Sequence, residues 1–147
     1  MTYTIKVVVY PPPQELVDFL ACETPRINGL FGDRYDLTKT DLEKIFKNYM
    51  CLYCTRDDEV TGILISYLGS SPFDESVKIL RQVIFYVKEE SGRTAYHLFK
   101  KFIDIGRLQA NYIITTLASQ TNIKPSTLER LGFNKLETLY RLEVDGE

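Results

Sequence analysis

Several residue types and patterns are scarce in or missing from this 147-residue sequence. It has no tryptophan, a single histidine (His97), no repeat or low-complexity tract, and no apolar run near the roughly 20 residues of a membrane span. An excess of one charge is also lacking, because 18 basic and 20 acidic residues give a net charge of −2. A protein that grips a nucleic-acid backbone usually carries a clustered positive excess. We therefore expect no membrane partner and find little to favour nucleic acid.

Cysteine usage argues against both a disulfide framework and a metal centre. The three cysteines are Cys22, Cys51 and Cys54. An odd count without an N-terminal signal peptide fits a reducing, cytoplasmic compartment. Cys51 and Cys54 form one C-x-x-C pair, but a four-ligand zinc site needs more donors than this pair and the distant His97 supply. On a strand the two side chains would point to opposite faces, which also excludes a redox pair. We expect reduced, structural cysteines and no metal.

The composition that remains is that of one globular core. Hydrophobic residues make up 44% of the chain and charged residues 26%, which excludes disorder. The length favours a single domain over residues 1–147, without separate cofactor and substrate lobes. Ten tyrosines raise the aromatic share to 12% and suggest half-exposed sheet faces and a groove.

The local patterns predict alternating strands and helices. Expected strands cover residues 3–10, 50–56, 60–68, about 78–87, 112–118 and 133–144. Expected helices cover residues 14–21, 94–109 and 126–131, and a further helix follows the capping box Thr40-Asp41-Leu42-Glu43, with Thr40 as its cap. Turns or breaks are expected at 28–29, 32–33, 57–59 and 69–72. Gly132 suits a left-handed C-cap.

The resulting order is β-α-α-β-β-β-α-β-α-β, an α/β fold with a mixed sheet. Residues 83–87 are apolar on both faces, so this strand belongs in the middle of a covered sheet. The long helix joins it to the strand at 112–118. Such a strand–helix–strand connection predicts parallel neighbours with a right-handed crossover.

Three places together resemble the GNAT (Gcn5-related N-acetyltransferase) superfamily. The first is the element order, over essentially the whole chain. The second is Asp58-Glu59-Val60-Thr61-Gly62-Ile63-Leu64, which is similar to a family hairpin with an acidic turn and an early glycine. The third is Leu128-Glu129-Arg130-Leu131-Gly132-Phe133, which resembles the family's C-terminal helix-to-strand signature. The resemblance implies the GNAT fold and an acyl-coenzyme A-dependent N-acyltransferase.

The resemblance also implies a cofactor loop at residues 87–95, with acetyl-coenzyme A as the cofactor. Ser91-Gly92-Arg93-Thr94-Ala95 is similar to a variant loop that is frequent in bacteriophage-encoded members. A helix N-terminus offers unpaired N–H donors to a pyrophosphate, and glycine permits its close approach. The implied cofactor contacts are Val87, Ser91, Gly92, Arg93, Thr94, Ala95 and Asn122. The loop departs from the family pattern at Glu89 and Glu90, whose charges would oppose a pyrophosphate unless they point away.

Catalytic residues cannot be assigned from the sequence. The family's usual thiolate-protonating tyrosine aligns with Leu128, and no carboxylate lies between Ile79 and Val87 to act as a base. Weak candidates are Tyr86, Ser119 and Tyr140. Strands 78–87 and 112–118 should part at their carboxyl ends to receive the pantetheine arm, which puts the reaction centre near Tyr86, Val87 and Ser119.

Plainer interpretations stand beside these. Arg93 also suits a solvated first helical turn, and Asn122 a turn or cap. His97 is more typical of a surface histidine, and Lys100 and Lys101 of an ordinary exposed helix face. Tyr86, like Tyr67, is more often a packing residue than a proton donor.

Three functions remain open at this point. The first is an acetyl-coenzyme A-dependent transferase acting on a primary amine, of a small molecule or a protein, by direct attack on the thioester. The second is a GNAT-fold binding or assembly module that has lost acyl transfer. The third, least favoured by charge, is a nucleic-acid modifier. The acceptor loops at 26–38 and 68–77 do not identify the substrate, and a homodimer is left open.

Overall fold

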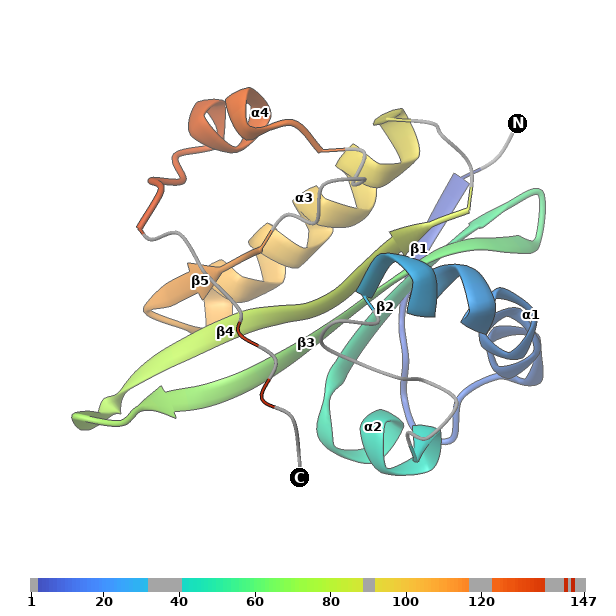
Figure 1. Ribbon diagram of the computed structural model, residues 1–147, viewed down its shortest axis with the longest axis horizontal. Coiled ribbons are helices and arrows are strands. Elements are labelled where there is room, and N and C mark those ends of the chain that lie inside the picture. The colour runs from blue at the N-terminus through green and yellow to red at the C-terminus, as the bar shows by residue number, and fades with distance from the viewer. Residues whose placement is uncertain are drawn as a thin grey trace.

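The protein is a mixed α/β fold of one sheet covered by helices (Figure 1). The computed structural model describes residues 3–31, 41–88, 92–116, 123–136, 142 and 144. Within them the strands are β1 (Tyr3–Val7), β2 (Met50–Arg56), β3 (Glu59–Ser71), β4 (Asp74–Val87) and β5 (Tyr112–Ile114). The helices are α1 (Gln14–Phe31), α2 (Leu42–Asn48), α3 (Gly92–Gln109) and α4 (Pro125–Arg130).

The described strands form one sheet in the order β1-β2-β3-β4-β5. Neighbouring strands are antiparallel up to β4, whereas β4 and β5 are parallel and are joined by α3. The predicted mixed sheet and the predicted parallel pair are therefore confirmed. The element order also agrees from β1 through α4.

Side chains alternate across the sheet and build a hydrophobic cluster on each face. The α1-side cluster joins α1 and α2 to residues such as Ile63, Ile84 and Tyr86. The α3-side cluster joins α3 to residues such as Leu64, Leu80 and Phe85. Helices α1 and α3 each bury one stripe of side chains against the sheet and leave the opposite face in water. Among the described helices none is long and apolar enough to cross a membrane.

Helix α1 is ten residues longer than the pattern predicts. The expected end at residue 21 and the irregular stretch at Asn28-Gly29 are wrong, because the helix continues to Phe31 with Pro25 inside it. Proline removes one backbone donor from a helix interior. Ile27, fully buried one turn beyond Glu23, continues the apolar stripe and anchors the second half. Tertiary packing therefore outweighs the local signal for a helix end.

Helix α2 is capped one residue later than expected. Its N-cap is Asp41, whose carboxylate accepts the backbone N–H of Lys44 at 3.3 Å, and Thr40 lies outside the described residues. The expected buried stripe is present, since Phe46 is buried and Leu42 and Ile45 pack against the same cluster.

The β3–β4 hairpin also departs from the predicted bounds. The expected break at 69–72 is wrong, because β3 continues to Ser71 and β4 begins at Asp74 (Figure 1). From Tyr67 onward the residues of β3 pair with β4 alone, because the β2 ladder ends at Met50–Ser66. The residues in this extension of β3 are mostly exposed. The sequence therefore lacks the apolar face by which a strand is recognised. The preceding turn contains only Asp57 and Asp58, and Glu59 already belongs to β3.

Helix α4 ends as predicted, but the strand expected after it does not begin there. Gly132 adopts a left-handed φ of 97°, its N–H bonds the Glu129 carbonyl, and the Phe133 N–H bonds the Leu128 carbonyl. These bonds close a Schellman motif, with Phe133 and Leu128 packed on the α3-side cluster. Residues 133–136 form no strand, so the strand predicted from Phe133 is wrong there, and 137–141 lie outside the described residues.

Candidate functional site

Strands β4 and β5 stop pairing after a short parallel ladder. The ladder joins Ile79 to Tyr112, Leu80 to Ile113 and Arg81 to Ile114, and β5 ends there. The strand predicted to continue to 118 is absent at 115–116, and 117–118 lie outside the described residues. Beyond it the side chain of Gln82 takes the place of a main-chain partner. Its Oε1 accepts the Thr115 hydroxyl at 2.6 Å and the Thr116 N–H at 3.3 Å. The Thr116 N–H, which would continue the ladder, is thus bonded to a side chain, so the described strands part at Gln82 in the sense that their main-chain pairing ends there.

A β-bulge lies at the same level of β4. In the ladder with β3, Ile65 faces Ile84 but the next residue, Ser66, faces Gln82, so Val83 is an extra residue. Bulges bend a strand and re-aim its side chains, and they are frequent beside active sites. The bulge and the end of the parallel ladder therefore coincide at residues 82–83 of β4, whereas residues 84–87 pair regularly with β3.

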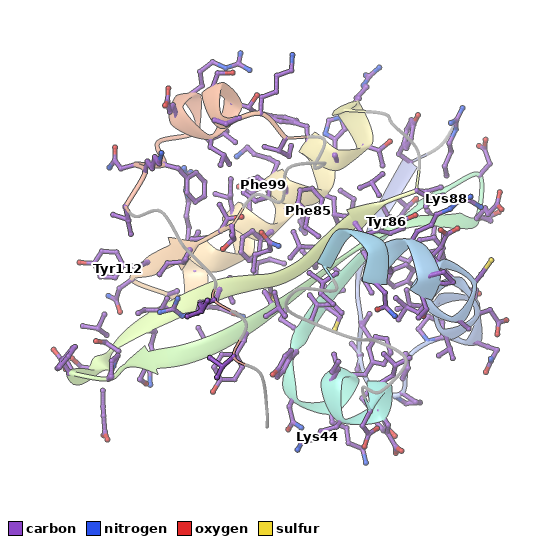
Figure 2. The ribbon with its side chains drawn as sticks, viewed as in Figure 1. Lys44, Phe85, Tyr86, Lys88, Phe99 and Tyr112 are labelled. Carbon is purple, nitrogen blue, oxygen red and sulfur yellow. The ribbon has the colours of Figure 1, made fainter. Side chains whose placement is uncertain are left out.

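Helix α3 lies along the parallel pair with its N-terminus toward the parted end. Gly106, near the end of α3, lies so close to β5 that a Cβ there would come within 2.6 Å of Ile113 Cδ1. Closer to the helix start, Phe99 stacks on Phe85 with ring centroids 5.7 Å apart (Figure 2). The helix therefore runs opposite to β4, and its first turn is at the carboxyl end of that strand. Ligands of open α/β sheets generally bind at this end.

Removing the Gln82 acceptor is expected to destabilise the junction. Gln82 is buried, so Gln82→Leu leaves the Thr115 hydroxyl and the Thr116 N–H without their acceptor. An unmet polar group in such a position costs about 1–3 kcal/mol. Urea unfolding should report a loss of this size. The same change at exposed Gln109 is the control, with an expected effect within about 0.5 kcal/mol. Equal effects of the two variants would contradict the bridging role of Gln82.

The described cofactor candidates gather at the start of α3. Gly92 is the first residue of that helix, Arg93 is exposed, and Thr94 and Ala95 are buried. Val87 is half-buried at the end of β4, where it pairs with Gly62. Residues of small size at a helix N-terminus leave its N–H groups open to an anion. Ser91, Asn122, Glu89 and Glu90 lie outside the described residues.

The catalytic candidates are only partly placed. Tyr86 is buried in the α1-side cluster, so its ring packs as the plainer interpretation has it, while Ser119 and Tyr140 lie outside the described residues. Burial is the largest cause that raises the pKa of Tyr86 above its ordinary value, and the hydrogen bond to Glu23 raises it as well. The phenol is therefore kept protonated. His97 is exposed on α3, as expected for a surface histidine.

A carboxylate that the sequence analysis missed lies against the end of β4. Glu23 of α1 is buried, and its Oε2 accepts the Tyr86 hydroxyl at 2.8 Å. Arg26 Nη1 lies 3.5 Å from the same oxygen, and Lys88 Nζ lies 3.8 Å from Oε1. Figure 2 shows Tyr86 and Lys88 beside α1, on the other side of the sheet from Phe85 and Phe99. The signal available in the sequence was a glutamate on the apolar stripe of a helix.

All three cysteines are free, with Cys22 exposed and Cys51 and Cys54 buried. None forms a disulfide, and Cys51 and Cys54 belong to the α1-side and α3-side clusters respectively, on opposite faces of β2. Burial raises the pKa of the Cys51 thiol to about 12, so it is a neutral core residue rather than a nucleophile.

Comparison with solved structures identifies the fold. A ribosomal-protein-alanine N-acetyltransferase from Brucella melitensis biovar Abortus 2308 matches with a TM-score of 0.71 at 13% identity, covering 98% of this chain and 100% of that chain. A GNAT family acetyltransferase from Staphylococcus aureus subsp. aureus USA300_TCH1516 matches with a TM-score of 0.66 at 14% identity, covering 98% and 100%. An aminoglycoside acetyltransferase from an uncultured soil metagenomic sample gives 0.68 at 15% identity, covering 99% and 100%. No protein-family model and no curated protein matches the sequence. This chain has the fold of the GNAT acetyltransferases.

Proposed function

We propose that the protein is an acetyl-coenzyme A-dependent N-acyltransferase that acetylates a primary amine by direct attack. The observation that carries the proposal is the parting of β4 and β5 at Gln82, with the N-terminus of α3 at the same end. The acetyltransferase fold supports it. A parallel ladder that ends after three pairs, beside a bulge, is what a site between two strands requires.

The residues present fit a coenzyme A-type cofactor. Helix α3 has 18 residues and begins with glycine, and no acidic residue lies in its first turn. The first-turn N–H groups would hold the pyrophosphate, and Arg93 lies beside them. Main-chain N–H groups of 82–87 on the β5 edge, past the end of the ladder, would orient the acyl carbonyl. When bound, acetyl-coenzyme A supplies the thioester that the amine opens, with the thiol as leaving group.

Cofactor binding is the direct test. Acetyl-coenzyme A should raise the melting temperature, because a ligand at about 100 times its Kd stabilises the native state by about 2.7 kcal/mol. ATP at the same concentration is the control for non-specific binding of phosphate. No shift at about millimolar acetyl-coenzyme A would remove the transferase from consideration.

A binding or assembly module is the second candidate. Leu128 stands where the family's proton-donating tyrosine usually stands, and here it packs on the α3-side cluster as part of the α4 cap. Binding of acetyl-coenzyme A without acetylation of any amine in a broad panel would favour this module. A nucleic-acid modifier, a homodimer, a cytoplasmic location and a bacteriophage origin stay predictions.

A further inference from the structure

Glu23 occupies a position where an apolar residue would be expected. Leu16, Leu20 and Ile27 of α1 are fully buried, and Glu23 lies on the same stripe with a side chain only 4% exposed. Burying a carboxylate is costly unless its partners compensate, and an apolar residue of similar size is often as stable or more so. Packing alone therefore gives no reason for a glutamate here.

The partners of Glu23 bring two positive charges together. Arg26 follows it by one helical turn, and Lys88 comes from the residue after β4. Both cations lie within 4 Å of the one carboxylate, yet their side chains are 67% and 42% exposed. Guanidinium has five N–H donors and ammonium three, so each has donors to spare. Glu23 offsets the repulsion between them, and the group as a whole keeps a net charge of about +1.

The Tyr86 hydroxyl is a third partner of the Glu23 carboxylate. This bond of 2.8 Å holds Glu23 Oε2 in place, and Arg26 lies 3.5 Å from the same oxygen. A hydrogen bond with Tyr86 and the charge of Glu23 raise the pKa of Arg26 above its ordinary value. The two cations are thus positioned in advance, which reduces the entropy lost when an anion binds.

Arg26 and Lys88 lie apart from the proposed cofactor loop. Lys88 directly follows the last residue of β4, but its side chain reaches α1, whereas α3 covers the opposite face of the sheet. The N-terminus assigned to the pyrophosphate belongs to α3. An anion held by Arg26 and Lys88 would therefore lie on the α1 face, at the carboxyl end of β4.

We propose that Arg26 and Lys88, held in position by Glu23, bind an anionic oxygen group of the acceptor. This inference rests on the proposed transferase function and names the acceptor's class: a primary amine that also carries a carboxylate or a phosphate. Arginine and lysine are the residues that bind such groups by charge-assisted hydrogen bonds. A polycationic amine would meet two positive charges and be repelled.

Three amines serve as probes: glycylglycine with a carboxylate, 2-aminoethyl phosphate with a phosphate, and cadaverine with neither. Calorimetric titration without acetyl-coenzyme A measures their binding to the protein itself. We expect at least one of the two anionic probes to bind, and its Kd to rise at least tenfold in Arg26→Gln and in Lys88→Met. Whichever anionic probe binds identifies the source of the charge. With acetyl-coenzyme A present, KM for that probe should rise by the same factor while kcat changes less than twofold.

Lys47→Met is the matched control, because Lys47 is 52% exposed and pairs with Glu43 on α2. It should leave probe binding unchanged. Glu23→Gln, which keeps an acceptor for Tyr86, tests the positioning role and should raise the same KM without a change in kcat. Tighter binding of cadaverine than of both anionic probes, or anionic binding that is equal in wild type, Arg26→Gln and Lys88→Met, would overturn the inference. A protein that binds an anionic probe through Arg26 but does not bind acetyl-coenzyme A would refute the transferase function. The same result would support the anion site.

Discussion

Gly92→Asp is expected to weaken coenzyme A binding by more than about a hundredfold while leaving the melting temperature of the unliganded protein nearly unchanged. Gly92 is the first residue of α3. An acidic side chain in the first turn suits the helix dipole, so the helix itself should tolerate it. The same charge would stand where the pyrophosphate approaches the N–H groups, and the added Cβ would hinder that approach. Titration of coenzyme A into both proteins gives the measurement.

Gly92→Ala separates charge from bulk, because it adds the Cβ without the carboxylate. We expect it to lose far less affinity than the aspartate variant. If Gly92→Asp binds coenzyme A as the wild type does, the α3 N-terminus is not the cofactor site. If the two variants lose affinity equally, sterics rather than charge governs the approach.

Phe99→Ala should lower the free energy of unfolding by about 3–5 kcal/mol, the range for loss of a buried phenylalanine. The Phe99 side chain is 0% exposed and lies at the centre of an aromatic group. Its ring centroid is 5.7 Å from Phe85, 5.6 Å from Phe102 and 5.8 Å from Phe133. It therefore joins β4, α3 and the segment after α4. Figure 2 shows Phe99 beside Phe85. Chemical denaturation measures the loss.

The matched control is Phe73→Ala at the tip of the β3–β4 hairpin. Phe73 is 97% exposed, so the identical change removes almost no burial and should cost less than about 0.5 kcal/mol. A small effect at Phe99 would show that the ring contacts contribute little, since the two substitutions differ only in environment.

The central strands could be predicted closely because both of their faces are covered. Met50–Arg56 agrees residue for residue, and the carboxyl end of β4 at Val87 agrees as well. Burial on both faces produces a dense apolar run, the strongest local signal that a strand has. The parallel arrangement of β4 and β5 also followed, since a long helix between two strands leaves few alternatives.

Where a helix or strand is stabilised by contacts with distant parts of the chain, its predicted end came too early. Asn28-Gly29 indicated an irregular stretch after a helix ending at residue 21, but the buried Ile27 holds the longer helix α1 against the sheet. Gly69 and Pro72 likewise suggested a long break, although β3 runs on to Ser71 by pairing with β4 alone. In both places the stabilising partner is far along the chain or lacks an apolar pattern.

For the candidate site, the sequence indicated the loop at the start of α3 and Tyr86, and the roles of these residues stay predictions. Gly92 was proposed because its spacing follows a local loop motif, and it begins α3. Glu23 was not, because its chemistry depends on Tyr86 and Lys88, more than sixty residues away. The role of Gln82 as a bridge between strands could not be predicted either, because it depends on the positions of Thr115 and Thr116.

The division of the core has an evolutionary consequence. In the described part of the chain, the α1-side and α3-side clusters have no residue in common, and only the sheet backbone lies between them. Substitutions without shared partners add in free energy rather than reinforce one another. Drift around α1 therefore leaves the packing of α3 intact. On the proposed function, lineages of this fold could exchange one acceptor for another through changes on one side of the sheet, without rebuilding the half that holds the acyl donor.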